Sequence, residues 1–161
     1  MVIIRQYKNG DWNQVISLMV EFGAYIEEID QLKRADYKEN SAKYFTENML
    51  SKASKFKGKT FVALENKNII GFISGHISKL GKEEKMETIN QKPGIVDEFF
   101  ITKSKRSKGI GNKLFEQLEK YFKSQSCDII RIEVFAPNTI ARTFYQNNGY
   151  IERSITVSKI I

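Results

Sequence analysis

The sequence has one cysteine, one histidine and no long apolar run, and each shortage excludes a class of protein. Cys127 alone cannot form an internal disulfide framework, which suits a reducing cytoplasm. One histidine and one cysteine leave no zinc cluster, so no metal is expected. No apolar stretch is long enough to cross a bilayer. Residues 2–5 resemble a strand and not a signal peptide, so we expect a cytoplasmic protein that does not bind membranes.

The composition is that of one globular domain. The chain has 161 residues, of which 41% are hydrophobic and 28% charged, and we expect a single domain over residues 1–161. The net charge of +7 suggests nucleic acid as a partner, but the lysines are spread along the chain. The exception is a basic cluster within residues 103–108, whose position beside glycines favours a small phosphate ligand over a duplex. No nucleic-acid partner is therefore expected.

The spacing of apolar residues predicts a mixed α/β (α+β) domain. Helices are expected where apolar residues recur at helical spacing, and strands where short apolar runs end at turn residues. The predicted helices, about four in number, cover residues 15–26, 37–56, 108–123 and 138–146, with Asp11 as a candidate N-cap for the first. The predicted strands cover residues 2–7, 61–64, 69–73, 95–102, 129–135 and 150–161. Asn66-Lys67-Asn68 is a predicted hairpin turn, and residues 79–94 are expected to form an exposed loop.

The most informative segment joins the predicted strand 95–102 to the helix that follows it. It reads Arg106-Ser107-Lys108-Gly109-Ile110-Gly111. A helix N-terminus presents unpaired N–H groups and the positive end of the helix dipole, and glycine lets the backbone approach an anion closely. The spacing is neither that of the Walker A loop nor that of the dinucleotide fingerprint. The segment therefore predicts a site for a different phosphate carrier.

Two blocks of sequence resemble the GNAT superfamily of acetyl-CoA-dependent N-acetyltransferases. The acetyl-CoA signature of that family is Arg or Gln, two residues, Gly, one residue, then Gly or Ala, and Arg106–Gly111 fits every defined position. The second block, Asn138-Thr139-Ile140-Ala141-Arg142-Thr143-Phe144-Tyr145 followed by Gly149-Tyr150, is similar to the family's Asn…Ala…Phe-Tyr…Gly-aromatic block. The resemblance implies a GNAT-like single domain, with a mostly antiparallel central sheet that splays between its fourth and fifth strands.

The resemblance also implies where coenzyme A binds. Its pyrophosphate would lie on the N–H groups of the turn, and its pantetheine arm would run between the fourth and fifth strands. A bulge in the fourth strand would aim an N–H at the acetyl carbonyl and stabilise an oxyanion. The residues expected to contact the co-substrate are Phe99, Ile101, Arg106, Ser107, Lys108, Gly109, Ile110, Gly111, Asn112, Asn138 and Tyr145.

Acetyl transfer to an amine needs a base for the amine proton and an acid for the departing thiolate. Tyr145 matches the family tyrosine that usually donates to the thiolate, and packing in the core is the alternative. Asp97 and Glu98 are candidate bases, because carboxylates inside an apolar strand are unfavourable unless solvated or used. Alternation places them on opposite faces of the sheet unless a bulge intervenes. Asp97–Ile101 is similar to the Glu-Asp-Phe-Phe-Val of diamine (polyamine) acetyltransferases, where the first acid is the base, which favours Asp97.

Several alternatives stay open on the residues alone. Glu98 could bind a cationic amine, or both acids could be rim carboxylates without a proton role. Asn138 fits a contact with the coenzyme A arm and a plain helix N-cap. A set of polar side chains lies where this family forms its acceptor pocket, although a solvated helix end explains them equally well: Tyr25, Glu27, Glu28 and Asp30. His76 is left out of the catalytic set, since a single strand histidine is more often packed or exposed.

The leading interpretation is an N-acetyltransferase that transfers the acetyl group of acetyl-CoA directly to a primary amine of a small-molecule or peptide acceptor. No covalent acyl-enzyme is expected, because no cysteine or serine stands in a recognisable nucleophile setting. The alternatives are a non-catalytic acyl-CoA-binding regulatory module and a basic nucleic-acid-binding protein. The identity of the acceptor is undetermined, and a homodimer stays open.

Overall fold

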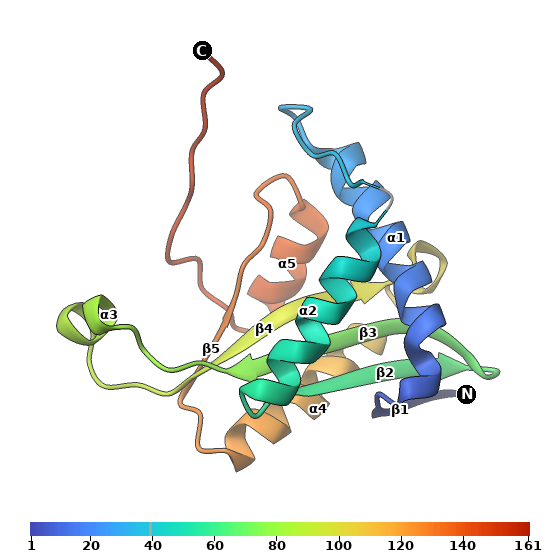
Figure 1. Cartoon of the computed structure of the whole chain (residues 1–161), viewed down its shortest axis with the longest axis horizontal. Helices are drawn as coiled ribbons and strands as arrows, with labels where there is room; N and C mark the ends of the chain where they lie inside the picture. The colour runs from blue at the N-terminus through green and yellow to red at the C-terminus, as the bar shows by residue number, and fades with distance from the viewer. Residues whose placement is uncertain (39) are drawn as a thin grey trace.

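The computed structural model describes residues 1–38 and 40–161, and it consists of a five-stranded sheet with helices on both faces (Figure 1). The strands are β1 (Val2–Gln6), β2 (Lys59–Glu65), β3 (Asn68–Ile77), β4 (Pro93–Ile101) and β5 (Ile129–Ile132). The α-helices in these ranges are α1 (Trp12–Ile29), α2 (Ser41–Lys55), α3 (Lys82–Glu87), α4 (Ile110–Ser124) and α5 (Thr139–Asn147). Single 3-10 turns, η1 (Asn9–Asp11) and η2 (Lys103–Lys105), precede α1 and α4. The predicted mixed α/β class is confirmed.

The sheet has the order β1-β2-β3-β4-β5. The first four strands pair antiparallel with their neighbours, and β5 pairs parallel with β4. The β2–β3 connection is the hairpin that the sequence predicts. Asn66 and Lys67 both have positive φ, at 50° and 69°. Two consecutive residues with positive φ are typical of the tight hairpin turn whose twist matches that of the flanking strands.

Helices cover both faces of the sheet because neighbouring strand residues point to opposite sides. On β3, Phe72 packs in the cluster beneath α1 and α2, while Ile73 packs in the cluster beneath α4. α4 contributes four fully or nearly fully buried side chains to the second cluster: Leu114, Phe115, Leu118 and Phe122. None of the helices in the described ranges is long and apolar enough to span a membrane.

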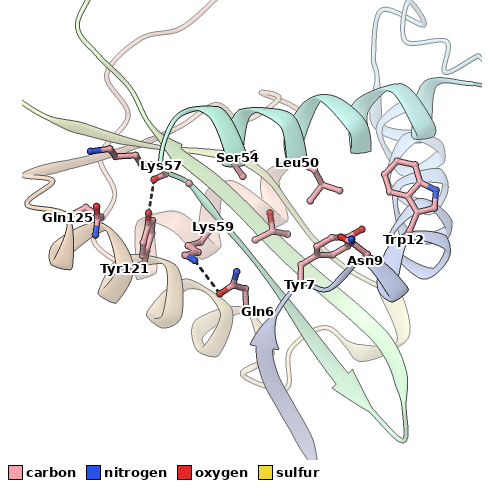
Figure 2. A pocket seen from close by; sticks show the side chains of 13 residues that line it. Gln6, Tyr7, Asn9, Trp12, Leu50, Ser54, Lys57, Lys59, Tyr121 and Gln125 are labelled. Carbon is pink, nitrogen blue, oxygen red and sulfur yellow. Dashed lines mark hydrogen bonds between the residues drawn. The ribbon is translucent and has the colours of Figure 1, made fainter.

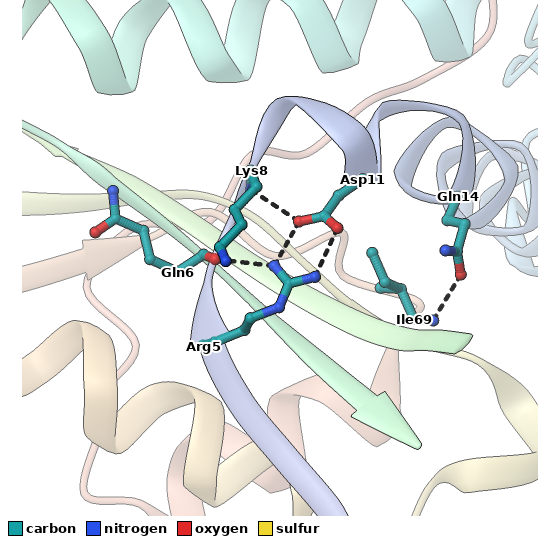
Figure 3. Close-up of polar contacts among 6 residues, drawn as sticks. All are labelled: Arg5, Gln6, Lys8, Asp11, Gln14 and Ile69. Atoms are coloured by element: carbon teal, nitrogen blue, oxygen red, sulfur yellow. Dashed lines mark hydrogen bonds and ion pairs between the residues drawn. The ribbon is translucent and has the colours of Figure 1, made fainter. Parts of the chain in front are cut away.

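Asp11 fixes the start of α1 against β1 (Figure 3). Its carboxylate accepts two hydrogen bonds from the Arg5 guanidinium, at 2.6 and 2.7 Å, and one from the Lys8 backbone N–H at 2.8 Å. The bond from Arg5 is the main reason why the pKa of Asp11 lies below its usual value. The N-cap prediction is corrected in one respect. Asp11 directly precedes α1, but its side chain bonds backward to Arg5 and Lys8 and makes no cap bond to the helix.

Three predicted elements differ in the structure. The predicted strand 150–161 is wrong for the single chain, because the segment after Tyr150 is irregular, exposed and paired with no strand in the described residues. β5 ends at Ile132, before the predicted limit at Phe135. The expected loop 79–94 contains α3 and the first residues of β4. The polar composition of this segment gives no apolar pattern from which a helix could be predicted. At the start of α3, the Glu84 side chain accepts a hydrogen bond from the Gly81 N–H at 3.0 Å.

Candidate active site

The sheet opens between β4 and β5. Pairing of these two strands covers only Pro93–Val96 with Ile129–Ile132, although β4 continues to Ile101 and stays paired with β3 to that point. Backbone groups of residues 97–101 that face away from β3 therefore have no strand partner. We call this opening the β4–β5 gap. The splay expected between the fourth and fifth strands is confirmed.

β4 carries a bulge at Asp97, where the gap begins. Glu98 pairs with Ser74 and Val96 pairs with Gly75, so Asp97 is an extra residue without a partner on β3. Asp97 contacts Lys52 of α2, and the positive charge of the same lysine lowers the pKa of Glu98. Both acids therefore lie near α2. The opposite-face arrangement that simple alternation predicts does not hold, because the bulge intervenes.

The Asp97 carboxylate is held by two basic side chains. Its Oδ1 lies 3.4 Å from Lys52 Nζ, and its Oδ2 lies 2.8 Å from His76 Nδ1. The Asp97 side chain is only 6% exposed. Within the described ranges, no group of three His, Cys, Asp or Glu side chains is arranged to hold a metal ion. Lys52 was missed from the sequence, and His76 was left out of the catalytic set, because α2, β3 and β4 meet only in the folded chain.

Glu98 is the acid whose proton affinity the fold changes most clearly. Burial is the main reason why its pKa rises to about 7, and the charge of Asp97 adds to this while Lys52 opposes it. Burial also raises the pKa of the Tyr37 and Tyr145 hydroxyls, and the charge of Glu98 adds to both effects. Glu98 therefore lies electrostatically close to two tyrosines from different elements. A carboxyl with a pKa near neutrality is suited to general base catalysis.

Tyr145 projects from α5 into an aromatic cluster beside the gap. Its ring centroid lies 5.9 Å from those of Phe115 and Tyr150, and 5.7 Å from that of Phe144. The residue is 8% exposed. Its hydroxyl makes no hydrogen bond to the described residues. Every fully buried side-chain N or O atom among these residues has a hydrogen-bond partner, so the Tyr145 hydroxyl is not fully buried and reaches solvent. The raised pKa keeps this hydroxyl protonated at neutral pH.

The backbone of β4 presents groups to the gap at alternate residues. The Thr102 N–H donates to Ile70 O of β3 at 3.0 Å, so Phe99 and Ile101 direct their backbone groups away from β3. The Ile101 carbonyl accepts a hydrogen bond from Arg106 Nε at 2.9 Å. The groups that remain open toward the gap are the N–H and C=O of Phe99 and the N–H of Ile101.

The turn before α4 leaves its backbone N–H groups free. Ser107 and Gly109 have positive φ, at 60° and 72°, and α4 begins at Ile110. In the part of the chain that the structure describes, the N–H groups of residues 107–112 have no acceptor. Gly111 has a second role, since a Cβ there would lie 3.0 Å from Phe144 Cε2. Its lack of a side chain lets α5 pack closely against the start of α4.

Arg106 holds this turn in place. Besides its bond to the Ile101 carbonyl, its guanidinium lies over the Tyr25 ring of α1, 4.7 Å from the centroid. Glu21 of α1 accepts hydrogen bonds from Thr102 Oγ1, at 2.8 and 2.9 Å, and from the Lys103 N–H at 3.0 Å. The turn is therefore fixed to both β4 and α1. A direct contact of Arg106 with phosphate stays a prediction, and the exposed side chains of the turn are those of Ser107 and Lys108.

Asn138 is the N-cap of α5. Its Oδ1 accepts hydrogen bonds from the Ala141 N–H at 3.2 Å and from the Tyr25 hydroxyl at 3.0 Å. The side-chain oxygen of Asn138 therefore caps the helix, as the N-cap interpretation predicts. Its Nδ2 has no acceptor within the described residues and remains available for a ligand.

A cavity of about 460 Å³ opens beside Tyr37. Its apolar walls come from the end of α1, the following loop, α2 and the segment after β5, through Ile26, Leu32, Tyr37, Phe45 and Phe135. Two acids expected in this region are bonded to the backbone. Asp30 accepts the N–H groups of Leu32, Arg34 and Ala35, and Glu27 accepts that of Tyr37. For these two acids the structure favours the interpretation that they shape the helix end.

A second cavity of about 810 Å³ lies between β1 and the ends of α2 and α4 (Figure 2). The Tyr121 hydroxyl donates to the Lys57 carbonyl at 2.8 Å, and Lys59 Nζ donates to Gln6 Oε1 at 3.3 Å. None of the predicted site residues lines this cavity. The candidate active site is therefore the β4–β5 gap together with the cavity beside Tyr37.

The site thus combines an open sheet, a bulged fourth strand and a turn whose N–H groups have no acceptor in the described residues. The model of the Acetyltransferase (GNAT) family matches residues 26–150, and the chain belongs to this family. An uncharacterised N-acetyltransferase of Methanocaldococcus jannaschii is 26% identical over 131 residues, which are 81% of this chain and 74% of that protein.

Solved structures share the whole fold. A mutant protein from Bacillus halodurans superposes with a TM-score of 0.79 at 20% identity, over 99% of each chain. AAC(6')-Iy, in complex with the bisubstrate analogue CoA-S-monomethyl-acetylneamine, superposes with a TM-score of 0.69 at 16% identity, over 100% of this chain and 99% of that one. The GNAT fold that two blocks of sequence predict is confirmed.

Proposed function

We propose that the chain transfers the acetyl group of acetyl-CoA directly to a primary amine of a small-molecule or peptide acceptor. One observation carries this proposal: Glu98, with a pKa of about 7, and the protonated Tyr145 hydroxyl lie together beside the open stretch of β4. This arrangement supports Glu98 and Tyr145 as the base and the acid for the two proton movements. The turn with free N–H groups follows the same strand.

The residues around the gap fit coenzyme A. The N–H groups of residues 107–112 precede and open the 15-residue helix α4, whose dipole favours a pyrophosphate at this end. Lys108 would add a positive charge there. The open backbone groups of Phe99 and Ile101 would bond the amides of the pantetheine arm, and Asn138 Nδ2 would supply one further donor.

Glu98 would accept the proton of the amine. A primary amine has a pKa of about 10.4 and keeps its proton at neutral pH. A carboxylate with a pKa of about 7 takes up that proton more readily than an ordinary one. The polyamine resemblance favours Asp97 for this role, but Asp97 is already bonded to Lys52 and His76. We assign Asp97 to positioning, because its charge acts on the pKa of Glu98.

Tyr145 would donate its proton to the leaving sulfur. Acetyl-CoA supplies the activated thioester, and the new N–C bond forms as the C–S bond breaks. Glu98 would take one proton from the ammonium before attack, the hydroxyl proton of Tyr145 would pass to the sulfur as the C–S bond breaks, and the second proton lost by the nitrogen would restore the Tyr145 hydroxyl. Direct transfer is favoured because the single thiol, Cys127, is a weak nucleophile: burial raises its pKa above the usual value. That single cysteine also supports a cytoplasmic location.

The cavity beside Tyr37 would receive the acceptor. Its walls are largely apolar and aromatic, and the charge of Glu98 reaches the Tyr37 side chain. This arrangement favours a cationic amine attached to an apolar or aromatic body. Because Glu27 and Asp30 are bonded to backbone, they give a polyamine acceptor no support.

Thermal unfolding with acetyl-CoA, followed by thiol release across a panel of amines, tests the proposal. The panel holds a polyamine, an aminoglycoside-like amine, amino acids and a peptide N-terminus. Acetyl-CoA at 100 times its Kd should stabilise the fold by about 2.7 kcal/mol, and at least one amine should release thiol. Stabilisation without release on any amine would favour the non-catalytic module. No stabilisation, with steeply salt-dependent affinity for nucleic acid, would favour the third interpretation.

A further inference from the structure

The cavity of about 810 Å³, which we call the second cavity, lies at the corner of the sheet where β1 ends (Figure 2). β1 pairs with β2 up to Gln6, the Tyr7 N–H donates to the Thr60 carbonyl at 2.9 Å, and the chain then turns into η1. Lys59, at the start of β2, therefore lies beyond the end of β1 and lines the cavity. The volume is within the range of small-molecule sites, and none of the residues assigned to acetyl transfer lines it.

Lys59 gives the second cavity a positive charge that no acid neutralises. Its Nζ lies 3.3 Å from Gln6 Oε1 and 5.8 Å from the centroid of the Tyr121 ring, so both of these partners are neutral. Lys57, which is exposed, adds a second ammonium group, and the ion pairs found among the described residues include neither lysine. Of the described residues that line the cavity, none is an aspartate or a glutamate. A cationic cavity without a counter-charge attracts an anion.

Aromatic side chains line both ends of the second cavity. Tyr7 and Trp12 lie at one end and Tyr121 at the other, with Lys59 between them (Figure 2). Tyr7 and Trp12 are half-buried, and Leu50 of α2 adds an apolar side chain beside them. Rings of this kind gain stability from stacked or edge contacts with another ring. The cavity thus combines a surface for a planar ring with a charge for an anionic group.

We propose that the second cavity binds a small aromatic acid, with its carboxylate on Lys59 and its ring against Tyr7 and Trp12. A lysine beside neutral groups matches a single negative charge, whereas the planar forks of arginine that suit phosphate are absent from the described lining residues. Both lysines would repel an amine. The cavity beside Tyr37 differs in this respect, because the negative charge of Glu98 reaches it. The two cavities would therefore take ligands of opposite charge.

The test compares an aromatic acid with its uncharged amide, 4-phenylbutyrate with 4-phenylbutanamide. Trp12 is the one tryptophan of the chain, so its fluorescence reports occupancy of the second cavity, and calorimetry measures the Kd. The acid should change the fluorescence saturably with a Kd of about 0.05–1 mM. The amide should bind about 10-fold more weakly, because it lacks the charge-assisted bond to Lys59. Equal affinity for the two probes, no binding of the acid, or binding that leaves the fluorescence unchanged overturns the proposal.

Two matched variants locate the charge that the acid uses. Lys59→Met should weaken binding of the acid by about 10-fold while the weak binding of the amide and the thermal unfolding midpoint stay unchanged, and Lys59→Arg should retain binding of the acid. Lys55→Met removes the same charge from an exposed position of α2 that does not line the cavity, and it should bind the acid normally. Equal losses in the two methionine variants, or displacement of the acid by acetyl-CoA, would place binding elsewhere and overturn the proposal. Because binding of the acid is measured without acetyl-CoA, the outcome is independent of the proposed acetyl transfer.

Discussion

Replacing Lys52 with methionine should move the pH dependence of acetyl transfer to higher pH. The Lys52 ammonium lowers the pKa of Glu98 and also lies 3.4 Å from the Asp97 carboxylate. Methionine keeps most of the apolar stem and removes the charge. Asp97 would then retain only His76 as a partner, and its repulsion of a charged Glu98 would increase. The protonated form of Glu98 would therefore persist to higher pH.

The structure sets the size of this shift. The Lys52 side chain is 42% exposed, so solvent screens its charge. A charge pair whose basic partner is this exposed contributes about 1 kcal/mol or less. Because one pKa unit corresponds to about 1.4 kcal/mol, the expected shift is about 0.5–1 pH unit upward. It starts from a midpoint near the Glu98 pKa of about 7.

The assay is kcat/KM for thiol release, measured from about pH 5.5 to 9, where the acidic limb reports the base of the free enzyme. The rate should rise with pH through the midpoint, and the variant should reach the plateau of the unmodified enzyme. Lys55→Met, at an exposed position of the same helix, is the matched control and should leave the profile unchanged. A Lys52 variant with an unmoved midpoint, or with a uniform loss at every pH, would refute the assignment of Glu98 as base.

Gly109→Glu should abolish acetyl-CoA binding in calorimetry while the protein stays folded, because a Cβ there meets no atom within 4 Å but the carboxylate would repel phosphate. The control, Gly109→Ala, has a side chain at the same positive φ without the charge and should still bind acetyl-CoA. Tight acetyl-CoA binding by the Gly109→Glu variant would exclude the turn from the site. Tyr145→Phe should lower kcat by about 10–100-fold with little change in acetyl-CoA affinity, and a loss confined to affinity would indicate a packing role. Glu98→Gln should stabilise the fold above pH 7. A carboxyl whose pKa rises from 4.5 to about 7 on folding stabilises the native state below pH 4.5, and that contribution is lost as the pH rises from there through 7. Denaturant unfolding should show a gain of up to about 3 kcal/mol at pH 8 that falls to about 1 kcal/mol at pH 5 and vanishes below about pH 4, and a constant difference would contradict the raised pKa.

The sequence predicts those parts of the fold that depend on local patterns. The Asn66-Lys67 turn is local chemistry, because both residues tolerate positive φ. The helix after the basic turn follows from apolar residues at helical spacing, which become the buried face of α4. The turn itself follows from its glycines and its position between a strand and a helix. Each of these features is determined by residues that are neighbours in the chain.

The properties of Asp97 and Glu98 could not be predicted from local sequence patterns. A bulge at Asp97 has no sequence signature, yet it brings both acids to the α2 side of β4. The partners of Asp97 come from α2 and β3, and burial of Glu98 depends on packing around it. The alternating segment after Tyr150 shows the converse case. Its pattern favours a strand, but a strand also requires an edge to pair with, and within the described residues this segment pairs with none.

Tyr25 of α1 contacts both the proposed donor turn and the start of α5. Its ring lies beneath the Arg106 guanidinium at the donor turn, and its hydroxyl donates to Asn138 at the start of α5. One turn later α1 ends, and Asp30 begins the loop that walls the acceptor cavity. α1 thus connects the proposed donor turn with the wall of the proposed acceptor cavity in one element.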